Sequence, residues 1–152
     1  MNEIETYVVM PGSPEVALCA RWRVAAFSVL ESSVAQEQRA LDAFAADPAQ
    51  VALIAKRGSV PVGTCLLVLS EIDPNHDVAP WLAGLFVAPE HRRCGAGAVL
   101  VRAIEQQARQ RGFERMFLYT TSAAGFYQRL GWHLVEQTDW KGFDTAFMSR
   151  AL

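Results

Sequence analysis

The sequence lacks several features that define specialised protein classes. Its longest nearly apolar tract covers residues 78–89 and contains two prolines, so it is too short to span a bilayer. No basic run extends beyond Arg92 and Arg93, and the net charge is −2, which argues against the massed Lys and Arg of a nucleic-acid-binding face. We therefore expect neither a membrane nor a nucleic acid as the partner of this chain.

Cysteine is also scarce. Cys19, Cys65 and Cys94 form no CxxC pair and leave one cysteine unpaired under any disulfide scheme, a pattern typical of reduced proteins. Residues 1–5 are acidic and lack the basic and apolar regions of a signal peptide. These features predict a cytoplasmic protein.

Residues that could ligate a metal are too dispersed to form a site. His91 and His133 are isolated from other ligand residues, so we expect no metal. Cys94 stands near the start of an expected helix, where the pKa of a thiol can fall. It is a candidate for chemical modification, but no His–carboxylate arrangement accompanies it to make it a nucleophile.

What is present fits one globular domain covering residues 1–152. The chain has 51% hydrophobic and 20% charged residues, as in soluble globular proteins, and 152 residues can bury roughly two thirds of the unfolded surface. No repeat, linker or low-complexity segment divides the chain. The sequence leaves open whether the chain forms a homodimer.

Hydrophobic periodicity and turn residues predict alternating strands and helices. Ser13 is the expected N-cap of a first helix, with Pro14 at its first position. The other expected helices cover 34–46 and the segment from the glycines at 95–97 to Gly112. The expected strands cover 4–9, 51–56, 60–69, 81–87, 115–120, 133–138 and 145–151, with a turn around 141–142. A sheet with helices on both faces predicts an α/β domain.

The expected helix after the glycines has two faces. Val99, Leu100, Ala103, Ile104 and Ala108 recur on one side, which we expect to be buried. The other side carries polar residues and is expected to face solvent, with Glu105 and Arg109 forming an i,i+4 pair. Its members are Arg102, Glu105, Gln106 and Arg109.

A short glycine-bearing turn, Arg92-x-x-Gly95-x-Gly97, connects the apolar residues 81–87 to this helix. The first N–H groups of a helix have no internal partner and carry partial positive charge. Glycines let a phosphate approach them closely. The spacing matches neither the dinucleotide fingerprint nor the P-loop, so taken alone it favours an ordinary turn over a phosphate site.

A second motif, Phe126-Tyr127-x-x-Leu130-Gly131-Trp132, follows the next expected strand. The two motifs occur in the order and at the separation typical of the GNAT superfamily of acetyl-coenzyme A-dependent N-acetyltransferases. The chain closely resembles that superfamily over about residues 81–135. The order of strands and helices elsewhere is compatible with it.

The resemblance implies a fold of the α+β type: a mixed, mostly antiparallel sheet that is splayed between its fourth and fifth strands. Coenzyme A lies in that wedge in the family. Its pyrophosphate is expected at the glycine turn and its pantetheine arm along the strand ending at Val87, where a backbone N–H also faces the thioester oxygen. Thr120, Thr121 and Ser122 stand where relatives carry an asparagine. The implied acetyl-coenzyme A-binding residues are Leu85, Phe86, Val87, Arg92, Arg93, Cys94, Gly95, Ala96, Gly97, Ala98 and Thr121.

The resemblance also implies that Tyr127 is the catalytic acid, because a phenol can protonate a departing thiolate while it stays neutral at pH 7. The general base is left open, since residues 81–87 contain no ionisable side chain where many relatives carry a glutamate. The candidates at the acceptor side are Glu31, Asp73, His76 and Asp77. Trp81 and Trp140 are candidates for the wall of the acceptor pocket, or are core residues.

The function expected from this resemblance is direct transfer of an acetyl group from acetyl-coenzyme A to a primary amine in a ternary complex. The favoured acceptor is a small cationic molecule. Acetylation of a protein N-terminus or lysine is an alternative, because fold does not determine substrate. A module that binds coenzyme A without catalysis is a second alternative, favoured only by the missing strand glutamate.

Overall fold

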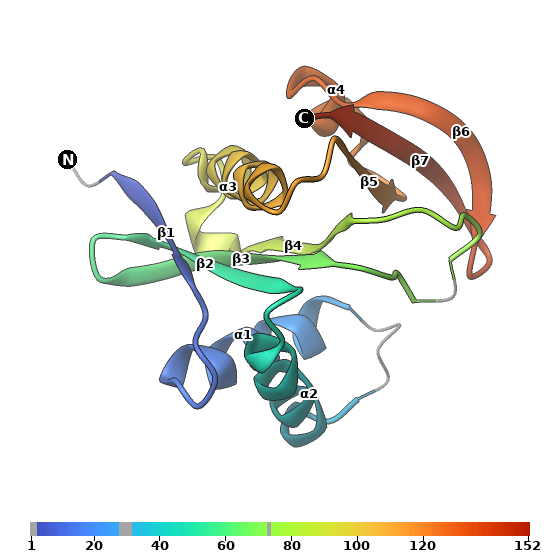
Figure 1. Cartoon of the computed structure of the whole chain (residues 1–152). Coiled ribbons are helices and arrows are strands. Elements are labelled where there is room, and N and C mark those ends of the chain that lie inside the picture. The colour runs from blue at the N-terminus through green and yellow to red at the C-terminus, as the bar shows by residue number, and fades with distance from the viewer. Residues whose placement is uncertain (1–2, 28–31, 73) are drawn as a thin grey trace.

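A computed structural model describes residues 3–27, 32–72 and 74–152, and the arrangement of its elements is shown in Figure 1. The strands are β1 (Ile4–Val8), β2 (Val51–Arg57), β3 (Val60–Val68), β4 (Trp81–Val87), β5 (Arg115–Thr120), β6 (His133–Trp140) and β7 (Phe143–Ala151). The helices are α1 (Pro14–Ala26), α2 (Val34–Ala46), α3 (Ala96–Gln110) and α4 (Ala124–Arg129), with a short 3-10 helix η2 at Pro89–His91.

The seven strands form one sheet in the order β1-β2-β3-β4-β5-β7-β6. Every neighbouring pair is antiparallel except β4 and β5, which run parallel and share a single register pair, Trp81 with Phe117. The two strands therefore separate after their first residues. This geometry confirms the expected mixed sheet that is splayed between its fourth and fifth strands.

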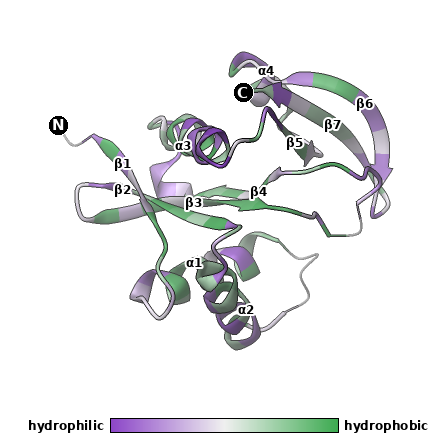
Figure 2. Ribbon diagram, viewed as in Figure 1, coloured by the Kyte–Doolittle hydropathy of each residue, from purple (hydrophilic) through white to green (hydrophobic). Residues whose placement is uncertain are grey.

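Helices cover both faces of the sheet, as expected. In Figure 1, α1 and α2 lie below the strands β1–β4 and α3 lies above them, while α4 lies beside β6 and β7. Hydrophobic residues concentrate on the central strands β2–β4 (Figure 2). Leu53 and Ala55 of β2 pack into the core beneath α3, whereas Ala52 and Ile54 pack toward α1 and α2, because successive side chains of a strand point to opposite faces.

Local sequence explains several element boundaries. Ser33 and Gln36 form a capping box at the start of α2, with the Ser33 hydroxyl accepting from the Gln36 N–H at 3.1 Å, so two orphan N–H groups are satisfied. Pro14 occupies the first turn of α1, although Ser13 donates its hydroxyl to Met10 O instead of capping the helix. At the β6–β7 hairpin, Lys141 and Gly142 both have positive φ. Because the turn needs only these two residues, β6 extends to Trp140 and β7 begins at Phe143. Both strands are therefore longer than the expected 133–138 and 145–151.

In the described ranges 3–27, 32–72 and 74–152, the structure contains no helix that is long and apolar enough to cross a membrane.

Candidate active site

A cleft of about 440 Å³ opens where β4 and β5 separate. Its lining residues come from distant parts of the chain: the end of α1, the segment before β4, β4 itself, the end of β5, α4 and the β6–β7 hairpin. Of the residues expected to bind acetyl-coenzyme A or to catalyse, Leu85, Thr121 and Tyr127 line this cleft. The splay of the sheet therefore produces a cavity that three of the expected site residues line.

The glycine turn adjoins the cleft at the end of β4. Gly95 is the N-cap of α3 in a left-handed conformation with φ 87°, and no side chain caps the helix or adds an acidic group to its first turn. A Cβ at Gly97 would lie 3.2 Å from Cζ of Phe126, which is tighter than ordinary packing. No described side chain therefore caps the first N–H groups of α3, and the absence of a side chain at Gly97 lets Phe126 of α4 pack against the first turn of this helix.

Arg92, Arg93 and Cys94 precede this helix start. Arg92 turns back over β4, with its Nε donating to Val87 O at 3.0 Å and its guanidinium 6.0 Å from the Phe86 ring centroid. Arg93 is exposed and has φ 65°. Cys94 donates its thiol to His91 O at 2.6 Å. Direct contact of any of these three side chains with a phosphate stays a prediction.

The strand β4 carries a bulge next to the cleft. Leu66 of β3 pairs with Ala83 and Thr64 pairs with Phe86, so Gly84 and Leu85 together oppose the single residue Cys65. Gly84 has φ 62°, a conformation that glycine adopts readily. A bulge re-aims the strand, and here it brings Leu85 to the cleft wall.

Tyr127 is the lining residue expected to act as an acid. It is 6% exposed and packs edge-on against the Phe126 and Trp132 rings. Burial, with a smaller contribution from Cys65, raises the pKa of the Tyr127 phenol above its usual range. The side chain is therefore a neutral phenol at physiological pH, the form that has a proton to donate.

Among the described residues that line the cleft, Glu71 is the one acidic side chain, and the sequence analysis did not identify it. Burial raises the pKa of its carboxyl, while the Ile72 N–H and the charge of Arg23 oppose that rise. The Ile72 N–H donates to Glu71 Oε1 at 3.0 Å. A carboxyl with a raised pKa in a cleft is a candidate for proton transfer.

Arg23 is the second charged residue of the cleft wall and was likewise missed from the sequence. Its Nε donates to Glu37 Oε1 of α2 at 2.7 Å, and its guanidinium lies over the Phe27 ring at 5.7 Å. The side chain is 12% exposed, and Nη1 is buried with no hydrogen-bond partner among the residues that the structure describes. Leaving such a donor unpaired costs about 1–3 kcal/mol, and more for a charged group.

Four residues were proposed from the sequence as general bases, and those that the structure describes do not line the cleft. Glu31 and Asp73 lie outside the described residues. His76 and Asp77 do not line the cleft. His76 Nδ1 lies 2.8 Å from the Tyr119 hydroxyl and Nε2 lies 2.9 Å from Glu136 Oε1. This histidine therefore holds its loop against β5 and β6.

Of the two tryptophans proposed for the wall of the acceptor pocket, one lines the cleft and the other is a core residue. Trp81 is fully buried in the core beside α1 and α2 and donates its indole N–H to Val78 O at 2.9 Å. Trp140 lines the cleft and donates its indole N–H to Ile72 O at 3.1 Å. The β6–β7 hairpin is thereby connected to the segment that carries Glu71.

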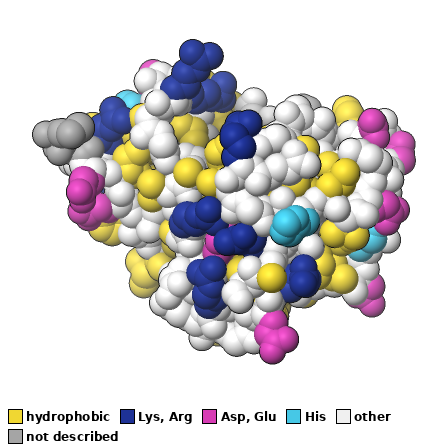
Figure 3. Space-filling model, turned by 90° about the horizontal axis from the view of Figure 1, so that it is seen from above, with side chains coloured by type: hydrophobic (Ala, Val, Ile, Leu, Met, Phe, Trp, Pro, Cys, Tyr) yellow, Lys and Arg dark blue, Asp and Glu magenta, His cyan; other side chains and the backbone are white. Residues whose placement is uncertain are grey.

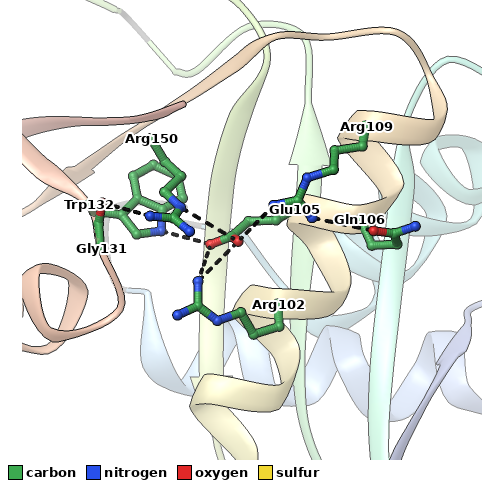
Figure 4. Close-up of polar contacts among 7 residues, drawn as sticks. All are labelled: Arg102, Glu105, Gln106, Arg109, Gly131, Trp132 and Arg150. Atoms are coloured by element: carbon green, nitrogen blue, oxygen red, sulfur yellow. Dashed lines mark hydrogen bonds and ion pairs between the residues drawn. The ribbon is translucent and has the colours of Figure 1, made fainter. Parts of the chain in front are cut away.

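The expectation that Glu105 faces solvent is wrong. Glu105 is 0% exposed, and its Oε2 accepts from the Trp132 indole N–H at 3.0 Å. The expected pairing with Arg109 is present at 3.8 Å, together with contacts to Arg102 at 3.1 Å and Arg150 at 3.8 Å (Figure 4). The carboxylate points from the polar side of α3 toward Trp132. There the segment after α4 and the strand β7 cover it.

Arginines around Glu105 contribute to a basic face. Seen from above, Lys and Arg side chains run across the middle of this face, and most Asp and Glu side chains lie at its margin (Figure 3). Arg102 and Arg109 of α3 are 48% and 41% exposed. This side of the molecule therefore attracts anions, although the net charge of the chain is −2.

Solved structures share this fold over nearly the whole chain. One is an aminoglycoside 6'-N-acetyltransferase complexed with coenzyme A, with a TM-score of 0.77, 15% identity and coverage of 97% of this chain and 96% of that one. Another is an acetyltransferase from Thermus thermophilus, with a TM-score of 0.72, 20% identity and coverage of 100% of both chains. Identities this low show a common fold.

Sequence comparison gives the family. An amino-acid acetyltransferase of Pasteurella multocida (strain Pm70) is 34% identical over 58 residues, which is 38% of this chain and 13% of that relative. The match therefore spans only a small part of the relative's length. The model of the acetyltransferase (GNAT) family matches residues 17–132, which include the bulge, the glycine turn, α3 and α4. This chain belongs to the GNAT family of acetyltransferases.

Proposed function

We propose that this protein transfers an acetyl group from acetyl-coenzyme A to the primary amine of a small molecule, directly and in a ternary complex. The observation that carries the proposal is the cleft at the β4–β5 splay, which places Tyr127 and Glu71 on its walls beside the glycine turn. A buried phenol and a carboxyl with a raised pKa are the acid and the base that amide formation from a thioester requires.

The residues at the turn fit acetyl-coenzyme A. The uncapped first N–H groups of α3 at Ala96, Gly97 and Ala98 are donors for a pyrophosphate, and Gly95 leaves open space beside them. Leu85, Phe86 and Val87 continue the strand edge that diverges from β5, with Thr121 on the opposite wall of the cleft. When bound, acetyl-coenzyme A supplies a thioester whose acetyl group moves to the amine as a C–N bond forms and the C–S bond breaks.

Two side chains then account for the protons. The Glu71 carboxylate takes the proton that the attacking ammonium group must lose. The Tyr127 hydroxyl donates a proton to the departing sulfur and recovers one from the nitrogen, which loses its second proton as the amide forms. A backbone N–H near Val87 stabilises the charge that develops on the carbonyl oxygen. Glu71 thereby supplies the carboxylate that residues 81–87 lack.

The acceptor enters as an ammonium ion, which makes it cationic at its reacting end. Glu71 attracts that charge, and the volume of about 440 Å³ suits a small molecule. We therefore favour a free small amine over a lysine or N-terminus of a folded protein.

The test is turnover of purified protein with acetyl-coenzyme A and a panel of amines, measured as free thiol release and as product mass. The panel contains amino acids, simple amines, polyamines, aminoglycosides and peptides with free N-termini. Thiol release with a small amine, together with a product heavier by one acetyl group, supports the proposal. Turnover confined to peptides would favour a protein substrate, and tight coenzyme A binding without turnover of any amine would favour the non-catalytic module.

A further inference from the structure

Arg23 lines the cleft with a guanidinium that its neighbours hold in place. Its Nε is occupied by Glu37 at 2.7 Å, and its guanidinium is held over Phe27 and against Gly84. These contacts orient the side chain and leave Nη1 as the buried donor without a partner among the described residues. Because a guanidinium edge matches the geometry of a carboxylate, an anionic oxygen is the group that best satisfies Nη1.

Glu71 presents the opposite charge to the same cleft. Burial raises the pKa of Glu71 and the charge of Arg23 opposes that rise, yet the ion pair that Arg23 forms is with Glu37. The Glu71 carboxylate therefore keeps capacity for a ligand beyond the Ile72 N–H that it already accepts. One acidic and one basic group on neighbouring walls complement a molecule with one charge of each sign.

This arrangement selects against acceptors with a single kind of charge. A polyamine or an aminoglycoside would bring positive charge against Arg23, and a purely anionic molecule would face Glu71. Among the residues that the structure describes, the remaining side chains at this end are apolar and provide no further charged group for a second ammonium ion or carboxylate. They are Ala26, Phe27, Ile72, Trp140 and Phe143.

We propose that the acceptor is an α-amino acid with an apolar side chain. Its carboxylate binds Arg23 Nη1, its amino group lies at Glu71, and its side chain packs among Phe27, Ile72 and Trp140. An α-amino acid carries its carboxylate and amine on one carbon, so both reach neighbouring walls while the amine faces the β4–β5 splay. This inference rests on the proposed acetyl transfer and names its substrate class.

The first test uses the native protein with matched acceptors. The series is L-phenylalanine, L-phenylalanine amide and phenethylamine, with L-leucine, L-leucine amide and isoamylamine as a second set. The amide and the amine keep the side chain and the reacting nitrogen but lack the carboxylate. We expect kcat/KM for the amino acids to exceed that for the amides and amines by about 10- to 100-fold, the range for one hydrogen bond to a charged group.

The second test removes the guanidinium. Arg23→Gln should reduce the preference for amino acid over amine, mainly by raising KM for the amino acid, and Arg23→Lys should restore part of it because the charge returns. Arg21→Gln is the matched control, since Arg21 is an exposed arginine of the same helix that does not line the cleft. It should keep the wild-type preference.

The outcomes separate this inference from the proposed function. If amides and amines are acetylated as well as amino acids, the inference is wrong and acetyl transfer stands. A preference for polyamines or aminoglycosides would also refute the inference and leave acetyl transfer standing. If no amine releases thiol, both fail. Should Arg23→Gln not fold, the acceptor series with the native protein still decides.

Discussion

The guanidinium of Arg23 on α1 packs against the backbone of Gly84 on β4, and a Cβ at position 84 would collide with Nη1 of that arginine. Gly84 also has φ 62° at the bulge of β4, so two independent constraints favour glycine there. This contact joins the first helix to the strand edge that forms the cleft. It therefore couples the acceptor wall to the wedge between β4 and β5.

Gly84→Ala should displace the Arg23 side chain and strain the bulge. A left-handed conformation costs a residue with a Cβ about 1–2 kcal/mol, which corresponds to a Tm lower by about 2–8 °C in a chain of this size. In an Arg23→Ala background the collision is gone and only the strain remains, so calorimetry should show a smaller cost of Gly84→Ala there. Equal costs in both backgrounds would contradict the contact.

Gly97→Glu should abolish stabilisation by acetyl-coenzyme A, because the new side chain places bulk and negative charge at the start of α3. At 100 times its Kd, the ligand should stabilise the wild-type protein by about 2.7 kcal/mol, measured as a shift in Tm. Gln106→Glu adds the same charge at an exposed position of α3 and should keep the shift. A folded Gly97→Glu protein with unchanged affinity would refute the phosphate site.

Tyr127→Phe should lower kcat by about 10²-fold with little change in the Kd of acetyl-coenzyme A. Because burial raises the pKa of the phenol, ionisation of Tyr127 should cause no loss of wild-type activity below about pH 10. Tyr7→Phe alters an exposed tyrosine of β1 and should leave kcat unchanged. Wild-type turnover by Tyr127→Phe from pH 6 to 9 would assign the acid to another group.

Glu71→Gln should lower kcat/KM by about 10²- to 10⁴-fold and at the same time stabilise the free protein at neutral pH. Burial raises the pKa of Glu71 in the folded state. The folded protein therefore holds the carboxyl proton of Glu71 more tightly than the unfolded chain does. The contribution of Glu71 to stability is therefore present below its unfolded pKa and is lost as pH rises through its folded pKa.

Comparison of Tm across pH checks this expectation. The advantage of Glu71→Gln over the wild type should appear as pH rises above the ordinary carboxyl pKa and disappear below it. A variant that is less stable than the wild type at pH 7 to 8, or that keeps full activity, would show that Glu71 is a structural residue.

Glu105→Gln should destabilise the fold without removing a group from the cleft. The substitution takes the charge from a fully buried carboxylate that accepts from Trp132 and lies near three arginines. Breaking such a cluster costs about 3 kcal/mol, or about 6–12 °C in Tm. Glu114→Gln changes an exposed glutamate and should stay within about 0.5 kcal/mol of the wild type. A Tm for Glu105→Gln equal to that of Glu114→Gln would mean that the cluster contributes no stability.

The sequence by itself determined the elements whose signals are local. The helix expected over 34–46 is α2 with the same bounds, begun by the capping residues Ser33 and Gln36, and Gly95 and Gly97 mark the start of α3. Periodicity separates the buried side of α3 from its exposed side, apart from Glu105. Such signals lie within a few residues of the element that they specify, so they can be read without knowing the fold.

Only the tertiary structure decided which charged residues reach the cleft. Arg23 is one of two arginines on α1, and Glu71 lies in a segment without a motif. Both line the cleft, because α1 packs beneath the bulge of β4 and Trp140 holds the segment beside Glu71. Glu105 is buried for the same kind of reason, since Trp132 approaches it from the segment after α4 and Arg150 from β7. A residue's burial and pKa depend on neighbours that are distant in sequence, and local patterns carry no record of those neighbours.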